Sequence, residues 1–163
     1  MSIILRTDLK DDTFLKVAAQ LSALGTCDRA AVGAVIVRDG RCISWGYNGA
    51  PPGTPHCSEN DHGWRGQGLI VGDETEEEKL EADRAAAQAL GCVNATHAEA
   101  NAVAFAARQG ISTDGTTLYV TVSPCEVCAR LLIAAGIVRA VWETEYRDPR
   151  GLNLLAEAGV ELL

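Results

Sequence analysis

The chain has 163 residues, of which 47% are apolar and 22% are charged, so it can bury the core of one folded domain and is not a disordered chain. Its formal net charge is −8, but residues 73–83 contain seven acids and one lysine, which leaves fifteen acids and thirteen bases elsewhere. We interpret the acidic run as a solvated helix face, and neither part of the chain offers the basic surface that nucleic-acid binding requires.

Membrane insertion and secretion are not expected either. The longest uncharged apolar runs, such as residues 131–138, fall far short of the ~20 residues of a membrane span. The N-terminal segment MSIILRTDLKDD lacks the long apolar stretch and cleavage site of a signal peptide. We therefore expect a cytoplasmic protein with no membrane partner.

The first elements in chain order are a helix and a hairpin. Apolar residues at helical spacing predict a helix over 11–24, with Asp11 or Asp12 as its N-cap. The β-rich segment 32–37 is followed by Asp39-Gly40, which is a typical hairpin turn, and the chain should return over 42–45. A mixed sheet would begin with this antiparallel pair.

A long loop separates this hairpin from the rest of the chain. Residues 49–72 contain six glycines and three prolines, and a long loop in a compact domain is usually functional. A helix is predicted over 73–90, and beyond it strands and helices alternate, which favours parallel strands covered by helices. The expected elements are helices over 97–109, 124–135 and 152–158, and strands over 116–122, 137–142 and 160–163. We predict an α/β fold in a single domain, residues 1–163.

Two short motifs contain the residues expected to carry the chemistry. Six cysteines in a chain without a signal peptide favour metal binding or catalysis over disulfides, and only Cys125 and Cys128 are closely spaced. They lie in the sequence PCEVC, and His97-Ala98-Glu99 precedes them. H-x-E followed by P-C-x-x-C is the signature of zinc-dependent nucleobase deaminases.

The second motif also has the sequence of a helix start. Ser123 is the expected N-cap, Pro124 suits the first turn and Glu126 would complete a capping box. Cys125 and Cys128 would then share one face of the first turn, where free N–H groups and the helix dipole lower thiol pKa values. Two thiolates in this position are good zinc ligands.

With His97 as the third ligand, the fourth position of a tetrahedral zinc stays open for water, as in catalytic sites. Zinc lowers the pKa of such a water towards ~7, and Glu99 would move the proton from water to the ring nitrogen and then to the leaving amine. Two alternatives remain: Thr96-x-x-Glu99 is also a capping box, and CxxC could be half of a structural zinc ribbon. A ribbon, however, requires a second CxxC, and the chain has none.

The chain resembles the deoxycytidylate (dCMP) deaminases of bacteria and phages, in the cytidine deaminase-like superfamily. The resemblance runs from about Phe14 to the C-terminus, and GYNGAPPG followed by His-Cys separates this family from other zinc deaminases. The matching segments are Cys27, VGAVIV from Val32, GYNGAPPG from Gly46, His56-Cys57, HAEANAV from His97, TLYVTVSPC from Thr117 and the Cys128–Gly136 helix.

The resemblance implies a three-layer α/β/α sandwich around a five-stranded mixed sheet, and hydrolysis of dCMP to dUMP and ammonia. It implies that Asn48 binds the deoxyribose hydroxyl and Tyr146 contacts the nucleotide, while Thr121 and Ser123 hold the pyrimidine. From the residues alone, Asn48 could be an ordinary turn residue and Tyr146 could simply pack beside Trp142.

The resemblance further implies a second zinc, because Cys27, Cys57 and Cys92 stand where family members have its ligands. His56 and His62 are the candidates for the fourth ligand. The alternative is that these are buried free cysteines.

Phosphate binding and regulation are further implications of the resemblance. Relatives have basic or amide side chains where this chain has Ala30 and Ala31, which leaves Arg29 and Arg147 as phosphate partners. Phe105 and Arg108 match positions tied to subunit contact and allosteric control. The family implies a homo-oligomer, hexamer or dimer, with dCTP and dTTP as effectors and Mg²⁺ accompanying the nucleotide.

The sequence is also compatible with other functions. The main alternative is a deaminase for another small substrate: cytidine, deoxycytidine, a modified pyrimidine, a pterin or a purine base. A zinc-stabilised interaction module is the non-enzymatic alternative. A deaminase of tRNA or single-stranded DNA is disfavoured because the sequence shows no basic stripe.

Overall fold

The computed structural model describes residues 6–27, 30–56 and 95–163. Five strands form one mixed sheet in the order β2-β1-β3-β4-β5, which confirms the expected sheet. The helices described are α1 (Arg6–Ser22), α3 (Ala98–Arg108), α4 (Glu126–Ala134) and α5 (Arg150–Glu157). The strands are β1 (Gly33–Arg38), β2 (Arg41–Tyr47), β3 (Thr116–Val122), β4 (Ile137–Thr144) and β5 (Glu161–Leu162).

The sheet combines an antiparallel half with a parallel half. β1 pairs antiparallel with both β2 and β3, whereas β3–β4 and β4–β5 are parallel. Asp39 and Gly40 both have positive φ angles, 50° and 71°, as the two-residue turn between β1 and β2 requires. The hairpin predicted from Asp39-Gly40 is therefore confirmed.

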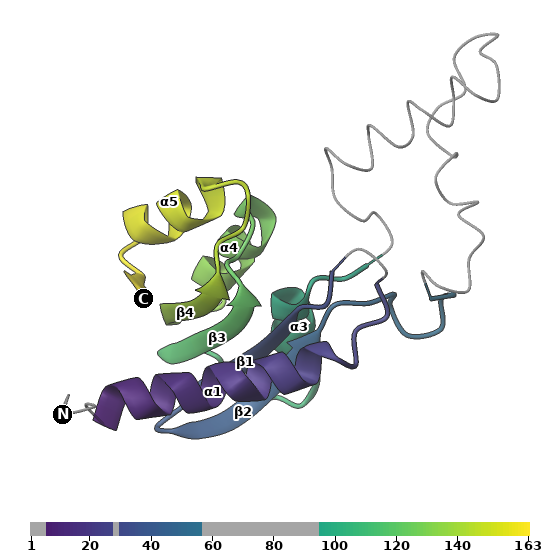
Figure 1. The fold of residues 1–163 in the computed structure, drawn as a ribbon, viewed down its shortest axis with the longest axis horizontal. Helices are drawn as coiled ribbons and strands as arrows, with labels where there is room; N and C mark the ends of the chain where they lie inside the picture. Colours follow the sequence, from purple (N-terminus) through teal and green to yellow (C-terminus); the bar gives the residue numbers. More distant parts are fainter. Residues whose placement is uncertain (1–5, 28–29, 57–94) are drawn as a thin grey trace, which may run out of the picture.

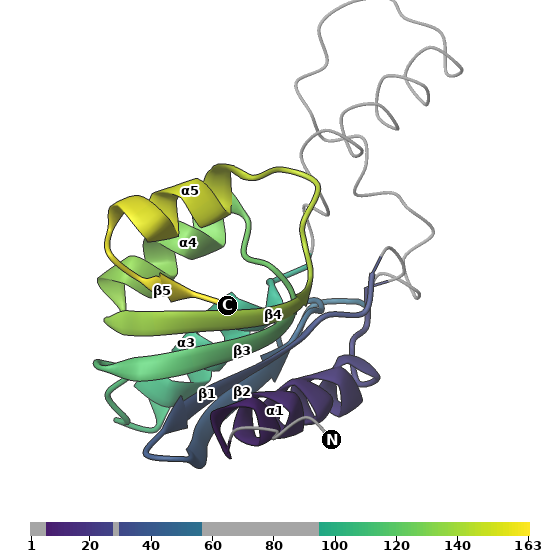
Figure 2. The ribbon, with the colours of Figure 1, turned by 60° about the vertical axis from the view of Figure 1, so that its left-hand side comes forward.

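Helices cover both faces of the sheet, and the alternation of side chains along the strands supplies a core for each face (Figures 1 and 2). Ile36, Leu118 and Leu132 belong to the larger core, under α3, α4 and α5. Val35 and Tyr119 belong to the smaller core, under α1. The result is the expected three-layer α/β/α sandwich.

One predicted helix boundary is wrong. α1 begins at Arg6, so Asp11 and Asp12 lie inside the helix and neither is its N-cap. The Asp11 carboxylate instead accepts hydrogen bonds from the Tyr119 hydroxyl at 2.7 Å and from Arg139 Nη2 at 2.7 Å. These partners come from β3 and β4, far along the chain, so the local sequence could not indicate that Asp11 faces the sheet.

The strand directions bring several chain segments to one edge of the sheet. β2, β3 and β4 run in the same direction, so their carboxyl ends lie together with the start of the antiparallel β1. α3 and α4 begin at this edge, with His97 and Cys125 as their N-caps. In open α/β sheets, ligands bind outside the carboxyl ends of the strands.

Parts of the sequence prediction lie outside the described residues, including most of the 49–72 loop and the 73–90 helix. Within the residues that the structure describes, no helix is long and apolar enough to cross a membrane.

Candidate active site

His97 is placed by the backbone where the chain enters α3. Thr96 pairs with Gly49 in an isolated antiparallel bridge, and His97 follows as the extended N-cap residue with φ −69° and ψ 153°. Its carbonyl accepts the Asn101 N–H at 2.9 Å. Gly46 of β2 lets the strand approach this helix start, because a Cβ at Gly46 would lie 2.4 Å from the Ala98 carbonyl oxygen.

The two cysteines are placed by the start of α4. Cys125 is the N-cap residue and Cys128 is buried in the first turn, so the expected shared face is confirmed. The prediction that Ser123 is the N-cap is wrong, because α4 begins two residues later. The Ser123 hydroxyl instead accepts the Tyr146 N–H at 2.8 Å, a contact with a distant segment that a capping pattern cannot reveal.

The three expected ligand atoms lie close together. His97 Nδ1 is 3.3 Å from Cys128 Sγ and 3.5 Å from Cys125 Sγ, and all three atoms are within 4.8 Å of one another. In a tetrahedral site with Zn–N and Zn–S bonds of about 2.05 and 2.3 Å, nitrogen and sulfur lie about 3.5 Å apart. The donor set and its spacing therefore fit zinc, with Nδ1 as the histidine donor.

The electrostatics of the two thiols also favour a cation. The pKa of Cys125 is lowered to about 4, mainly because the Cys128 thiol donates a hydrogen bond to it. The pKa of Cys128 is raised, first by that same pairing with Cys125 and then by burial. A divalent metal lowers the pKa of the thiols that coordinate it and so favours both thiolates.

Glu99 lies in the first turn of α3 and is only 3% exposed. Burial is the main cause that raises the pKa of its carboxyl group, and its own backbone N–H partly offsets that effect. The capping alternative for Glu99 is not supported, because the N-cap is His97 rather than Thr96 and no side-chain cap bond is formed. A buried carboxyl group of raised pKa beside the ligand group suits proton transfer.

A pocket of about 280 Å³ opens beside these residues. It is walled by the start of β1, the ends of β2, β3 and β4, and the start of α3. Its lining residues are Cys27, Ala30, Val32, Asn48, Ala95, His97, Ala98, Glu99, Val122, Ser123, Cys125, Glu145, Tyr146 and Arg147. The structure thus brings most of the described candidate residues into a single cavity.

Asn48 lines this pocket and also holds its wall together. Its side-chain N–H donates to the Ala30 carbonyl at 2.6 Å, and its Oδ1 accepts the Val32 N–H at 2.8 Å. An amide side chain can form about four hydrogen bonds, so capacity remains for a ligand. Asn48 is only 6% exposed, and its two hydrogen bonds hold the amide in one orientation.

The end of β4 contributes residues that the sequence only partly indicated. Tyr146 and Arg147 line the pocket, and the Arg147 guanidinium carbon lies 5.7 Å from the centre of the Tyr146 ring. Glu145 lines it as well, although no sequence motif singled it out. Thr121 is not part of the lining, and its hydroxyl accepts the Gly33 N–H at 3.2 Å.

The remaining candidates divide into two groups. Cys27 and His56 are described, and Cys27 lines the pocket. Arg29, Cys57, His62 and Cys92 lie outside the described residues.

Phe105 and Arg108 lie on α3 outside the pocket lining. The Phe105 ring is 44% exposed and lies 6.0 Å from the Trp45 ring of β2. Trp45 is itself 40% exposed and stacks on Tyr47.

Comparison with known proteins identifies the family of the chain. Residues 9–144 match the family described as the cytidine and deoxycytidylate deaminase zinc-binding region, and the chain belongs to that family. It is 35% identical over 171 residues to the deoxycytidylate deaminase of Enterobacteria phage T4, covering 94% of this chain and 89% of the relative. It is 38% identical over 135 residues to the deoxycytidylate deaminase of Mycobacterium phage D29, covering 83% of this chain and 94% of the relative.

Among solved structures, the chain is similar to the dCMP deaminase of cyanophage S-TIM5 in complex with dCMP and dUMP. The TM-score is 0.74, the sequence identity is 28%, and the match covers 98% of each chain. The likeness extends to the whole sandwich, which confirms the expected cytidine deaminase-like fold.

Proposed function

We propose that this protein hydrolyses dCMP to dUMP and ammonia at the pocket formed by the starts of α3 and α4. The observation that carries the proposal is the close group of His97, Cys125 and Cys128, of which His97 and Cys125 line one pocket with the buried Glu99. The similarity to deoxycytidylate deaminases over most of the chain supports dCMP as the substrate.

The residues divide the chemistry between them. His97, Cys125 and Cys128 would hold zinc, which when bound supplies a Lewis acid that lowers the pKa of a water molecule towards ~7. The Glu99 carboxylate takes one proton from the attacking water and passes it to the ring nitrogen. It then takes the second proton from the hydroxyl group now on C4 and gives it to the amine, which leaves as ammonia while the C4 carbonyl forms. Water is consumed and ammonia is released, so the step balances without an oxidant or a reductant.

The pocket walls would bind the rest of the nucleotide. Asn48 offers its remaining hydrogen-bonding capacity to the deoxyribose hydroxyl, and Tyr146 packs against the nucleotide. Ser123 and the backbone near Thr121 hold the pyrimidine. Arg147, which lines the pocket, would bind the phosphate, and Arg29 remains the second proposed phosphate partner from the sequence.

The finer assignments extend this proposal. A second zinc on Cys27, Cys57 and Cys92, with His56 as the fourth ligand, would give two zinc ions per chain by elemental analysis. Assembly as a homo-oligomer through the face with Phe105 and Arg108 is supported by the exposure of Phe105 beside Trp45. Regulation by dCTP and dTTP with Mg²⁺, and a cytoplasmic location, are proposed on the family resemblance.

The substitution Glu99→Gln tests the mechanism. It preserves the shape of the side chain but removes the base, so zinc content should stay at the wild-type value while dCMP turnover falls by roughly 10²–10⁴-fold. Near-normal turnover would contradict the role of Glu99, and a zinc-free wild-type protein would contradict the mechanism.

The substrate is tested on the wild-type enzyme by comparing dCMP with deoxycytidine and cytidine. If Arg147 and Arg29 bind the phosphate, removing that group should lower turnover as well as weaken binding, because the ring is then less well placed. Equal efficiency on dCMP and deoxycytidine, or activity on neither, would favour a deaminase for another small substrate.

A further inference from the structure

The chain between β4 and α5, residues 145–149, is fastened to the segment that carries the first cysteine ligand. We call residues 123–126 the ligand loop. The Ser123 N–H donates to the Thr144 carbonyl at 2.9 Å, and the Tyr146 N–H donates to the Ser123 hydroxyl at 2.8 Å. The beginning of the ligand loop is therefore bound to the strand end that leads into the pocket-lining residues.

The first turn of α5 meets the same loop further along. Gly151 is buried there, and a Cβ at this position would lie 2.0 Å from the Pro124 carbonyl oxygen and 2.8 Å from the Cys125 carbonyl carbon. No left-handed backbone angle demands a glycine at this position. The absence of a side chain is required because the helix packs directly on the backbone of Pro124 and Cys125.

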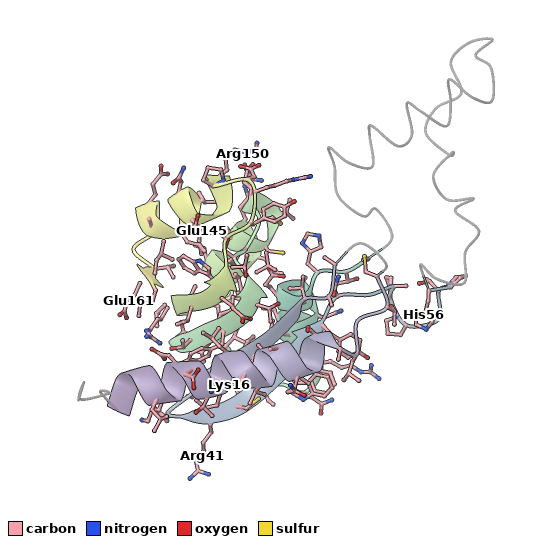
Figure 3. All side chains as sticks on the ribbon, viewed as in Figure 1. Lys16, Arg41, His56, Glu145, Arg150 and Glu161 are labelled. Carbon is pink, nitrogen blue, oxygen red and sulfur yellow. The ribbon has the colours of Figure 1, made fainter. Side chains whose placement is uncertain are left out.

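An ion pair joins the same two helix starts at the surface. Arg150 Nη1 lies 3.0 Å from Glu126 Oε2, and Arg150 also pairs with Asp148. Figure 3 shows Arg150 at the beginning of α5. Because the Arg150 side chain is 68% exposed, this pair reinforces the contact weakly, and the packing of Gly151 is the stronger constraint.

We infer that Gly151 is a positioning residue for the zinc site: its contact with Pro124 and Cys125 sets the place of the Cys125 sulfur relative to His97. The inference rests on the zinc-dependent function proposed above. Relief of a 2.0 Å contact to even 3.0 Å requires a movement of about 1 Å, whereas metal–ligand distances tolerate only about 0.2 Å. A side chain at residue 151 should therefore act on the metal centre without touching it.

The experiment compares Gly151→Ala with Gly159→Ala. Gly159 lies just beyond the other end of α5, where its φ is 79° and a Cβ would meet nothing within 4 Å. Both substitutions strain the same helix, but only Gly151→Ala presses on the ligand loop. Zinc affinity is measured by competition with a chelator, and the site geometry by the visible absorption spectrum of the Co²⁺-substituted protein.

For Gly151→Ala we expect zinc affinity to fall by about tenfold or more, as when supporting contacts of metal ligands are removed, together with an altered Co²⁺ spectrum. For Gly159→Ala we expect affinity within about twofold of the wild type and an unchanged spectrum. Equal affinities and spectra for the two folded variants would overturn the inference. A wild-type protein without zinc would overturn the proposed function instead.

A milder pair of variants decides the question if Gly151→Ala does not fold. Arg150→Ala removes the ion pair between the two helix starts, whereas Arg130→Ala removes only the pair that Glu126 makes within α4. We expect zinc affinity to fall about two- to fivefold in Arg150→Ala and less in Arg130→Ala. No difference between the two would overturn the inference.

Discussion

The ion pair between Asp11 and Arg139 should contribute measurably to the free energy of unfolding. Asp11 Oδ2 lies 2.7 Å from Arg139 Nη2, and the two side chains are only 19% and 16% exposed. Asp11→Asn keeps the size of the side chain but leaves the guanidinium half-compensated, with Glu161 at 3.4 Å as its remaining carboxylate partner. Charged hydrogen bonds are worth about 1.5–3 kcal/mol, and breaking a fully buried pair costs about 3–5 kcal/mol.

We expect Asp11→Asn to lower the free energy of unfolding by about 2–3 kcal/mol, because this pair is mostly but not fully buried. For a domain of this size the melting temperature should fall by about 4–12 °C. The matched control is Asp12→Asn. Asp12 pairs at 2.6 Å with Lys16, and both side chains are exposed, so its loss should cost under about 0.5 kcal/mol.

The stabilising contribution of this ion pair should be lost as the pH falls. Hydrogen bonding to Arg139 holds the pKa of Asp11 below its usual value, so the pair stabilises the fold above the unfolded pKa of ~3.9 and is lost as the pH falls through the lower folded value. The difference between wild type and Asp11→Asn should be constant between about pH 5 and 8 and should shrink below about pH 4. A difference that matches the Asp12→Asn control at pH 7, or that persists unchanged in acid, would refute the reasoning.

The contact between Asp11 and Tyr119 should also affect the pKa of the tyrosine. Burial and the Asp11 carboxylate raise the pKa of Tyr119 to about 12. Asp11→Asn removes the negative charge, so the pKa of Tyr119 should fall towards its ordinary value of ~10. Absorbance of the tyrosinate measures the shift, and Tyr119→Phe identifies the titrating residue.

Two further predictions concern packing and assembly. Gly46→Ala should destabilise the protein by about 3 kcal/mol, because its Cβ would lie 2.5 Å from the Ala102 nitrogen. Chemical denaturation should show a smaller loss of about 1–2 kcal/mol for Gly53→Ala, whose Cβ meets nothing within 4 Å but whose φ of 84° favours glycine. Phe105→Ser should weaken a homo-oligomer that forms through the Phe105 face. Val138→Thr, which also changes an exposed apolar side chain, should leave association unchanged. Light scattering over a concentration series measures both variants, and equal association of the two would argue against that face.

The sequence predicted strands, turns and helix starts well where a short stretch of residues determines them. β3 spans Thr116–Val122 as expected, and the Asp39-Gly40 turn forms with the required positive φ angles. The H-x-E and P-C-x-x-C motifs also correctly indicated two helix starts. For the turn and the two helix starts, the determining interactions lie within a few residues of one another, whereas β3 was recognised from its run of β-branched residues although its pairing partners β1 and β4 are distant.

The predictions that failed involve partners far apart in the sequence. Asp11 has the sequence context of an N-cap, but Arg139 and Tyr119 bind it from β4 and β3. Ser123 likewise looks like a cap, but its hydroxyl accepts the N–H of Tyr146. Ser, Asp and Asn side chains compete between local and distant partners, and only the packed fold decides between them.

The topology explains why the site residues are so dispersed in the sequence. Because β1 is antiparallel to β2 and β3 while β3 and β4 are parallel, the start of β1 and the ends of β2, β3 and β4 meet at a single edge. Two helices begin at that edge, and each presents its ligands from the N-cap or the first turn. A third helix, α5, packs through Gly151 on the backbone of Pro124 and Cys125, just before α4. The proposed zinc site should therefore depend on how these helix starts are held against one another, and this is the physical basis for the inference that Gly151, which binds neither metal nor substrate, positions a ligand.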